Sequence, residues 1–330
     1  MLVGHDEQVD AFRAAFAGGQ VHHAWLLAGP AGVGKASFAH AAAAWVLAGR
    51  PAVPRFEVDA DAAAVKLLAA GSHLDFRLVE RVVNPNVKTD AKLRAQITID
   101  QIVRRKDSKF EPPLSECLRS TPVLGDWRVV IVDAIDDMNV NAANALLKHL
   151  EEPPPGTLFL CVSHSPGRLL PTLRSRCRRL SFRPLGDTDT AIVLRSAAPE
   201  LSADDLAALV KIADGVPGRA LRYAAAGVAG LTRELDELAA SPPSAVPGRA
   251  LTLARSLSGK TATARYAAFL DLAPAHLATQ ARTRRGPALA RTLAAWETAS
   301  DLASGAMALQ LDPQAVAFEL AGLVAGAGDG

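Results

Sequence analysis

Residues 29–35 read Gly-Pro-Ala-Gly-Val-Gly-Lys, which matches the pattern of a phosphate-binding loop. Glycines in such a loop let backbone N–H groups approach phosphate oxygens, and Lys35 would reach the terminal phosphates. An apolar run precedes the loop and a helical segment follows it, which is the context that the motif requires. The sequence therefore predicts a site for ATP or ADP. Its glycines are Gly29, Gly32 and Gly34.

The metal chemistry of this site is incomplete. Ala36 stands where the pattern needs Ser or Thr, whose hydroxyl binds Mg²⁺. Ser37 follows, but on a helix it points about 100° away and substitutes poorly. Asp133 ends an apolar strand, where a Mg²⁺-binding acid is expected, although loop acids are also common there. The next residue, Ala134, is not the carboxylate that would activate water. We expect weak nucleotide binding, and no hydrolysis by the chain alone.

Other polar residues are placed to contact phosphate. Ser163 and His164 follow a later apolar run and are weak candidates for sensing a γ-phosphate. Arg219 opens a helix after Gly-Val-Pro-Gly. It would reach phosphate across a domain junction, or it is a solvated arginine in the first turn.

An arginine-rich stretch follows a short apolar run. Ser175 and Arg176 lie within it, and an arginine on a short apex stabilises phosphoryl-transfer charge in a neighbouring subunit. The alternative is a solvated basic edge or a patch that binds nucleic acid. The five arginines within ten residues are Arg174, Arg176, Arg178, Arg179 and Arg183.

Alternating strands and helices would position these side chains. Short apolar runs predict strands, and helical spacing predicts the helices between them. Asp100 is a candidate N-cap, and Asn139 caps a helix that Pro153 to Pro155 stop. The alternation predicts a parallel α/β sheet over residues 1–185. Predicted strands are 24–28, 76–79, 129–133, 158–162 and 179–182, and predicted helices include 7–18 and 35–47.

The strands stop after Pro184. Three short helical segments follow, at 187–197, 203–213 and 219–226, and longer Ala/Leu-periodic helices begin near residue 230. The last has Asp312 as N-cap and Pro313 at its first position. Residues 241–248 resemble a linker or long loop.

Composition excludes several classes. The net charge of the 330 residues is +2, so any role in nucleic-acid binding would come from a local patch or from partners. Three widely spaced cysteines form no disulfide framework or metal spacing, which fits a reducing cytoplasm. The adjacent histidines His22 and His23 project differently and favour a structural role. We expect a cytoplasmic protein with no signal peptide and no membrane span.

Three short segments resemble one known family. They are Asn-Ala-Leu-Leu-Lys at 144–148, Leu-Glu-Glu-Pro-Pro at 150–154 and Leu-Arg-Ser-Arg-Cys at 173–177. Together they resemble the clamp-loader branch of the AAA+ ATPases. The missing hydroxyl at Ala36 and acid at Ala134, with the segments at 2–5 and 22–27, are most similar to the bacterial delta-prime family of DNA polymerase III. The resemblance covers residues 1 to about 225.

The resemblance implies three domains and a set of partners. The domains would be an AAA+ nucleotide-binding α/β domain at 1–185, a small helical lid at 186–228, and an all-α collar at 229–330 that oligomerises. Implied partners are the tau/gamma motor subunits and the clamp-opening delta subunit, with the sliding clamp and primer-template DNA reached through the complex. Arg176 would act on ATP of the adjacent motor subunit. Relatives often carry a four-cysteine zinc module, but residues 49–75 contain no cysteine, so we expect no zinc.

The sequence leaves three hypotheses for the function of this chain. The leading hypothesis is a non-hydrolysing stator subunit of the clamp loader. The second is an active tau/gamma-like ATPase motor, against which Ala36 and Ala134 argue. The third is a small-molecule phosphotransferase, which would not need a long helical collar.

Overall fold

The computed structural model describes residues 2–19, 21–82, 96–104, 112–225, 228–259 and 262–328. The chain forms two compact units. The N-terminal unit comprises Met1–Asp189 and Asp214–Val216, and the C-terminal unit comprises Thr190–Ala213 and Pro217–Gly330. The predicted α/β domain falls in the first unit, and nearly all of the predicted lid and collar falls in the second.

The N-terminal unit is built on a five-stranded parallel sheet with the order β2-β3-β4-β1-β5. Its central strands are buried on both faces, which explains why they read as continuous apolar runs. The predicted parallel α/β fold is confirmed, with strand ends shifted by one residue at most. The strands are β1 Ala24–Ala28, β2 Phe76–Glu80, β3 Arg128–Asp133, β4 Thr157–Ser163 and β5 Arg178–Ser181.

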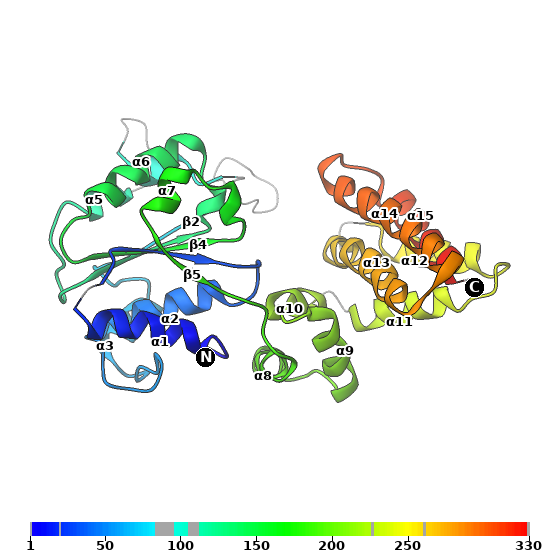
Figure 1. Cartoon of the computed structure of the whole chain (residues 1–330), viewed down its shortest axis with the longest axis horizontal. Coiled ribbons are helices and arrows are strands. Elements are labelled where there is room, and N and C mark those ends of the chain that lie inside the picture. Colours follow the sequence, from blue (N-terminus) through cyan, green and yellow to red (C-terminus); the bar gives the residue numbers. More distant parts are fainter. Residues whose placement is uncertain are drawn as a thin grey trace. The chain divides into compact units, whose positions relative to one another are not determined.

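Helices cover both faces of the sheet (Figure 1). On one face, Phe12 and Phe38 pack with Trp25 and Trp45 in a shared aromatic cluster. On the other face, Leu146 packs over strands β3 and β4. The first layer contains α1 Asp6–Ala17, α2 Lys35–Leu47 and α3 Ala63–Ala69, and the second contains α4 Ile99–Ile102, α5 Leu114–Cys117, α6 Val140–Glu151 and α7 Pro171–Ser175.

Two N-cap predictions had different outcomes. The Asn139 Oδ1 accepts a hydrogen bond from the Ala142 N–H at 2.8 Å, as predicted for the start of α6. The prediction that Asp100 caps α4 was wrong, because Thr98 is the N-cap and Asp100 lies in the first turn. The Thr98 N–H donates to the Gln101 Oε1 at 3.1 Å, which is one half of a capping box.

The regular elements among the described residues of the C-terminal unit are all helices. Leu206 and Tyr223, from its first helices, share one hydrophobic cluster with Phe269 and Leu320 from its last ones. The Asp312 carboxylate accepts a hydrogen bond from the Ala315 N–H at 2.8 Å, which confirms the predicted cap. No helix among the described residues is long and apolar enough to span a membrane. The helices are α8 Asp187–Ala197, α9 Ala203–Ala213, α10 Pro217–Ala225, α11 Val228–Ala239, α12 Val246–Ser256, α13 Thr263–Thr283, α14 Gly286–Ala308 and α15 Pro313–Gly328.

Candidate functional site

The phosphate-binding loop leaves the sheet between two strand ends. Ala28, the last residue of β1, is in register with Ser163 of β4 on one side and with Ser181 of β5 on the other. The Gly29 N–H donates to the Ser163 carbonyl at 3.3 Å. The carboxyl ends of parallel strands meet at this edge, which is where open α/β sheets bind ligands.

Each loop glycine has a structural reason. A Cβ on Gly29 would collide with the backbone of Phe182, directly after β5. Gly32 and Gly34 have φ angles of 84° and 112°, which side chains other than glycine rarely adopt. The loop geometry is therefore part of how the domain packs, as well as a cradle for phosphate.

Lys35 is turned into its own loop. Its ammonium group donates to the carbonyls of Gly29 and Pro30 at 2.7 and 2.5 Å, and the residue is only 2% exposed. Burial lowers the pKa of Lys35 to about 8, while the negative charges of Asp133 and Asp136 partly oppose this shift. To bind Lys35, a phosphate would have to displace the two carbonyl oxygens that accept hydrogen bonds from its ammonium group. This competition favours weak nucleotide binding.

The residues expected to handle a metal are only partly gathered. Asp133 is half-buried at the end of β3, close enough to Lys35 for their charges to interact. Ala36 offers no ligand, and Ser37 is exposed on α2. Ala134 is buried and has no carboxylate. The chain thus places the Lys35 ammonium and the Asp133 carboxylate near the loop. It lacks the hydroxyl that would bind a metal and the second carboxylate that would activate water.

Asp136 has a role that sequence reasoning missed. Its carboxylate accepts hydrogen bonds from the Ser163 hydroxyl at 2.9 Å and from the backbone N–H groups of His164 and Ser165 at 2.6 and 3.1 Å. These bonds hold the carboxyl end of β4 next to the loop. Burial, and then the charge of Lys35, lower the pKa of His164. The only sequence signal was an acid three residues beyond the end of a strand.

The segment before α1 covers the loop. His5 Nε2 lies 2.9 Å from the Val33 carbonyl, and its ring packs edge-on against Phe182 at a centroid distance of 4.9 Å. A Cβ on Gly34 would approach His5 Nε2 at 3.3 Å. Burial lowers the pKa of His5, so the neutral ring donates to the carbonyl near pH 7.

Arg176 lies just beyond α7, in a different position from the loop. Its Nη2 forms an ion pair with Glu151 at 2.7 Å, and its Nη1 donates to the Thr172 carbonyl at 3.0 Å. The side chain is 34% exposed. Arg219 belongs to α10 of the C-terminal unit, where its charge acts on Tyr223. Its predicted contact with phosphate stays a prediction.

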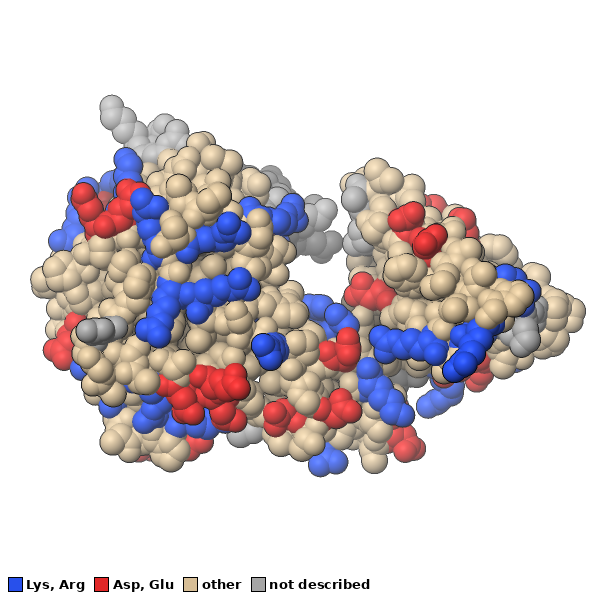
Figure 2. Space-filling model, in the orientation of Figure 1, with Lys and Arg blue, Asp and Glu red and all other residues tan. Residues whose placement is uncertain are grey.

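The other arginines of the stretch follow the edge of the sheet. Arg178 and Arg179 are exposed on β5, which pairs only with β1 among the described strands. Figure 2 shows a row of basic side chains across the N-terminal unit where Figure 1 places β5. The Arg178 guanidinium also packs on the Trp25 ring at 4.8 Å. Charged side chains on an exposed edge strand discourage its pairing with strands of other chains. The exposed arginines of β5 would protect this edge in that way without binding a ligand.

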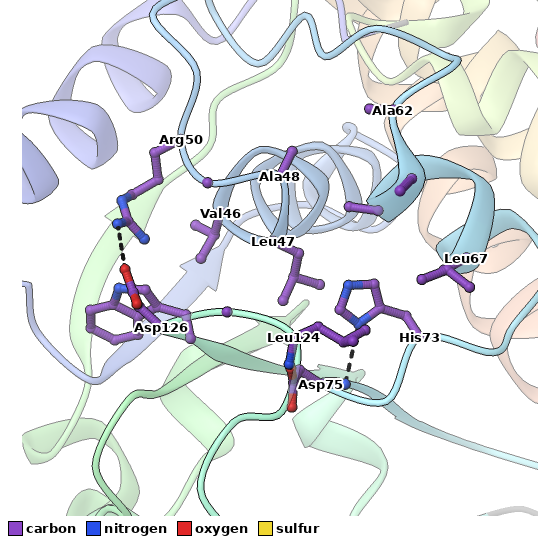
Figure 3. Close-up of a pocket in the computed structure, with 15 residues that line it drawn as sticks. Val46, Leu47, Ala48, Arg50, Ala62, Leu67, His73, Asp75, Leu124 and Asp126 are labelled. Atoms are coloured by element: carbon purple, nitrogen blue, oxygen red, sulfur yellow. Dashed lines mark hydrogen bonds and ion pairs between the residues drawn. The ribbon is translucent and has the colours of Figure 1, made fainter.

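A groove of about 490 Å³ lies at the opposite edge of the sheet (Figure 3). Leu47 and Leu67 line it above a polar floor formed by His73 and Asp75. The Asp75 carboxylate is fully buried and accepts from the Val123 N–H at 2.8 Å, so it serves the fold. The groove lies where strands β2 and β3 begin and is separate from the phosphate loop.

The described residues hold no cluster of three side chains suited to a metal ion. The rings of His22 and His23 stack at 4.6 Å. His23 Nε2 lies 2.9 Å from the Leu150 carbonyl, at the end of α6. His22 Nδ1 lies 2.8 Å from the Ala24 carbonyl, so both rings lie at hydrogen-bond distance from backbone carbonyls.

Known proteins resemble the sheet-containing part of this chain. The family described as DNA polymerase III, delta subunit, matches residues 4–186. DNA polymerase III subunit delta' of Pseudomonas aeruginosa is 37% identical over 206 residues, which are 62% of this chain and 57% of that protein. The subunit delta' of Escherichia coli is 31% identical over 208 residues, 63% of this chain and 56% of that protein. The matched stretch thus spans little more than half of each relative.

A tau/gamma subunit is also similar. DNA polymerase III subunit tau/gamma of Haemophilus influenzae is 27% identical over 223 residues, which are 66% of this chain and 28% of that protein. Its identity is lower than that of the two delta' proteins.

Proposed function

The chain belongs to the family described as DNA polymerase III, delta subunit, and from this premise we propose that it is the delta-prime stator of a bacterial clamp loader. In this role it hydrolyses no ATP itself. It helps to load the sliding clamp onto primed DNA, and it supplies Arg176 to ATP bound by an adjacent subunit.

One combination of features carries the proposal. The loop keeps its glycines and Lys35, but Ala36 and Ala134 replace the metal-binding hydroxyl and the water-activating acid. Meanwhile Arg176 stays partly exposed on the same domain. Phosphoryl transfer depends on metal placement and on a charge-stabilising arginine, so this chain lacks the first and offers the second. Bound ATP or ADP would therefore be held weakly and without turnover.

The proposed partners follow from the same role. They are the tau/gamma motor subunits and the clamp-opening delta subunit, with clamp and primer-template DNA reached through the complex. The helices of the predicted collar are rich in Ala and Leu, as expected of an oligomerising region. A tau/gamma-like motor is the less favoured reading, because such an enzyme needs the groups that Ala36 and Ala134 replace.

The test is Arg176→Ala in the reconstituted clamp loader. Folding and assembly should be intact, because exposed arginines add little stability. Turnover at the adjacent site should fall by about 10³-fold or more, as for loss of a trans arginine. Total ATPase stimulated by DNA and clamp should fall only in part, since other sites remain.

Arg179→Ala is the matched control, because Arg179 is an exposed arginine of the same stretch. It should leave the stimulated ATPase unchanged. If both substitutions weaken DNA binding equally and neither changes ATPase per bound complex, the stretch binds nucleic acid and the finger assignment is wrong.

A further inference from the structure

Two separated segments of the sequence meet at Arg176. Glu151 is the last residue of α6, and its carboxylate pairs with the Arg176 guanidinium at 2.7 Å, across 25 positions of the chain. Both side chains are partly exposed, at 46% and 34%. The two side chains thus pair with each other within the domain, and both remain partly accessible from outside it.

The rest of the guanidinium is held by α7. Nη1 donates to the Thr172 carbonyl at 3.0 Å and lies 3.4 Å from the Ser175 hydroxyl. The Ser175 hydroxyl itself donates to the Thr172 carbonyl at 3.1 Å. Three of the five N–H donors of Arg176 thus have partners among the described residues, and two remain for an external acceptor.

The backbone that carries the Glu151 carboxylate is held in turn by buried contacts of its neighbour. Leu150, directly before Glu151, is 1% exposed in the core beneath α6. Its carbonyl accepts a hydrogen bond from His23 Nε2 at 2.9 Å. Burial lowers the pKa of His23, so the ring is neutral and keeps this bond near pH 7. The end of α6 is therefore tied to the segment that enters β1, and Glu151 projects from a fixed point.

We infer that Glu151 is a positioning residue for Arg176, holding its guanidinium in one orientation for a phosphate group on a neighbouring subunit. The inference rests on the proposed function, because it assumes that Arg176 acts in trans. A free arginine side chain samples many rotamers, and an ion pair with a fixed carboxylate restricts them before the phosphate arrives. Arginine binds phosphate through two parallel N–H bonds, and two donors of Arg176 remain for such an acceptor.

The expected effect is modest. A partly exposed ion pair typically changes an equilibrium by about two- to fivefold, so Glu151→Gln should lower turnover at the adjacent site by that factor. The total stimulated kcat of the reconstituted loader should fall by less than it does in Arg176→Ala, since other sites remain. KM for ATP should stay constant, since the lost interaction is made in the transition state. Glu151→Asp keeps the charge on a shorter side chain and should give an intermediate kcat.

Glu152→Gln is the matched control, because Glu152 is the exposed neighbour with the same charge. It should behave like the unmodified loader. In the Arg176→Ala background, Glu151→Gln should have no further effect, because its action passes through Arg176. Thermal unfolding of each isolated variant checks that the fold is intact.

Each outcome separates the two ideas. If Arg176→Ala leaves the ATPase unchanged, the proposed trans role fails. If Arg176→Ala lowers ATPase but Glu151→Gln matches Glu152→Gln, only the positioning inference fails. An increase in turnover in Glu151→Gln would mean that the carboxylate restrains Arg176. A decrease that persists without Arg176 would mean that Glu151 acts elsewhere. Either result overturns the inference.

Discussion

The phosphate loop and the Arg176 turn each carry a cation suited to phosphate, but the protein holds these cations in opposite ways. Lys35 is 2% exposed and donates to carbonyls of its own loop, and burial lowers its pKa to about 8. The Arg176 side chain is 34% exposed and pairs with a carboxylate. A guanidinium stays charged at any physiological pH. The first cation is committed to the chain, and the second is available to another molecule.

The glycines of the phosphate loop have structural roles that do not depend on ATP hydrolysis. Gly29 packs against the backbone of Phe182, and Gly34 lies under His5. These contacts serve the fold whether or not nucleotide is turned over. A hydroxyl at position 36 and an acid at position 134 would be needed only to bind metal and activate water, and the chain has Ala36 and Ala134 there. The Arg176 side chain, by contrast, is partly exposed and pairs with Glu151 at the surface, which fits the role in a neighbouring subunit that we propose.

The largest expected effect concerns catalysis by the isolated chain. Its ATP turnover should lie below about 10⁻³ s⁻¹, the scale of nucleotide hydrolysis without a finger arginine. Ala36 and Ala134 motivate this expectation, and a steady-state phosphate-release assay measures it. A rate near 1 s⁻¹ that Lys35→Ala abolishes would place a working ATPase in the loop and remove the contrast with Arg176.

A metal titration sharpens the same point. Labelled nucleotide should bind with nearly the same affinity with and without Mg²⁺, because the loop N–H groups and Lys35 need no metal to bind an anion. A strong dependence on Mg²⁺ would show that Ser37 or another group supplies the missing ligand.

The next effect is on stability. Gly29→Ala should lower the free energy of unfolding of the N-terminal unit by about 2–3 kcal/mol, because its Cβ would collide with the Phe182 backbone. Arg176→Ala should cost under about 1 kcal/mol, as for an exposed ion pair. Urea unfolding followed by circular dichroism compares them. Gly167→Ala, where a Cβ has open space, is the control. Equal costs for Gly29→Ala and Arg176→Ala would contradict the distinction between a packed loop and a surface turn.

The smallest effect is on pH dependence. Nucleotide affinity should fall by up to about tenfold between pH 7 and pH 9, because Lys35 has a pKa of about 8 and is charged only below it. Bound phosphate favours the charged form, so the midpoint in the complex lies above that of the free chain. Fluorescence anisotropy with labelled ADP measures this effect. Lys35→Arg should flatten the profile, because arginine does not titrate there. An unchanged profile in Lys35→Arg would assign the titration to another group.

The elements of the sheet domain could be predicted because their signals are local. Short apolar runs identified β1, β3 and β4, and alternation identified β2. The short segment 179–182 was also predicted as a strand, and Asn139 identified the start of α6. The cap of α4 was missed because Thr98 and Asp100 both have side chains that cap helices, and only the backbone at Thr98, whose N–H donates to the Gln101 side chain, decides between them. The domain divisions near residues 185 and 228 remain predictions beside the two units that the structure shows.

The site was predictable in part for the same reason. The loop and Lys35 follow a contiguous pattern, so their sequence identified them. Asp136 was not recognised, because its three hydrogen bonds reach residues 27 to 29 positions away. The pairing of Glu151 with Arg176 was also out of reach, although both segments had been singled out by resemblance.

By itself, the sequence determined the strands, the phosphate loop, the missing hydroxyl and acid, and the presence of an arginine-rich stretch. Each of these is a property of neighbouring residues. Only the tertiary structure decided which cation faces inward and which outward, because burial and partner choice depend on strands that meet across the sheet. Lys35 is enclosed by the carbonyls of its own loop, which leaves the sheet between the ends of β4 and β5. Arg176 is held at the surface because α6 ends beside α7, with Glu151 at its tip.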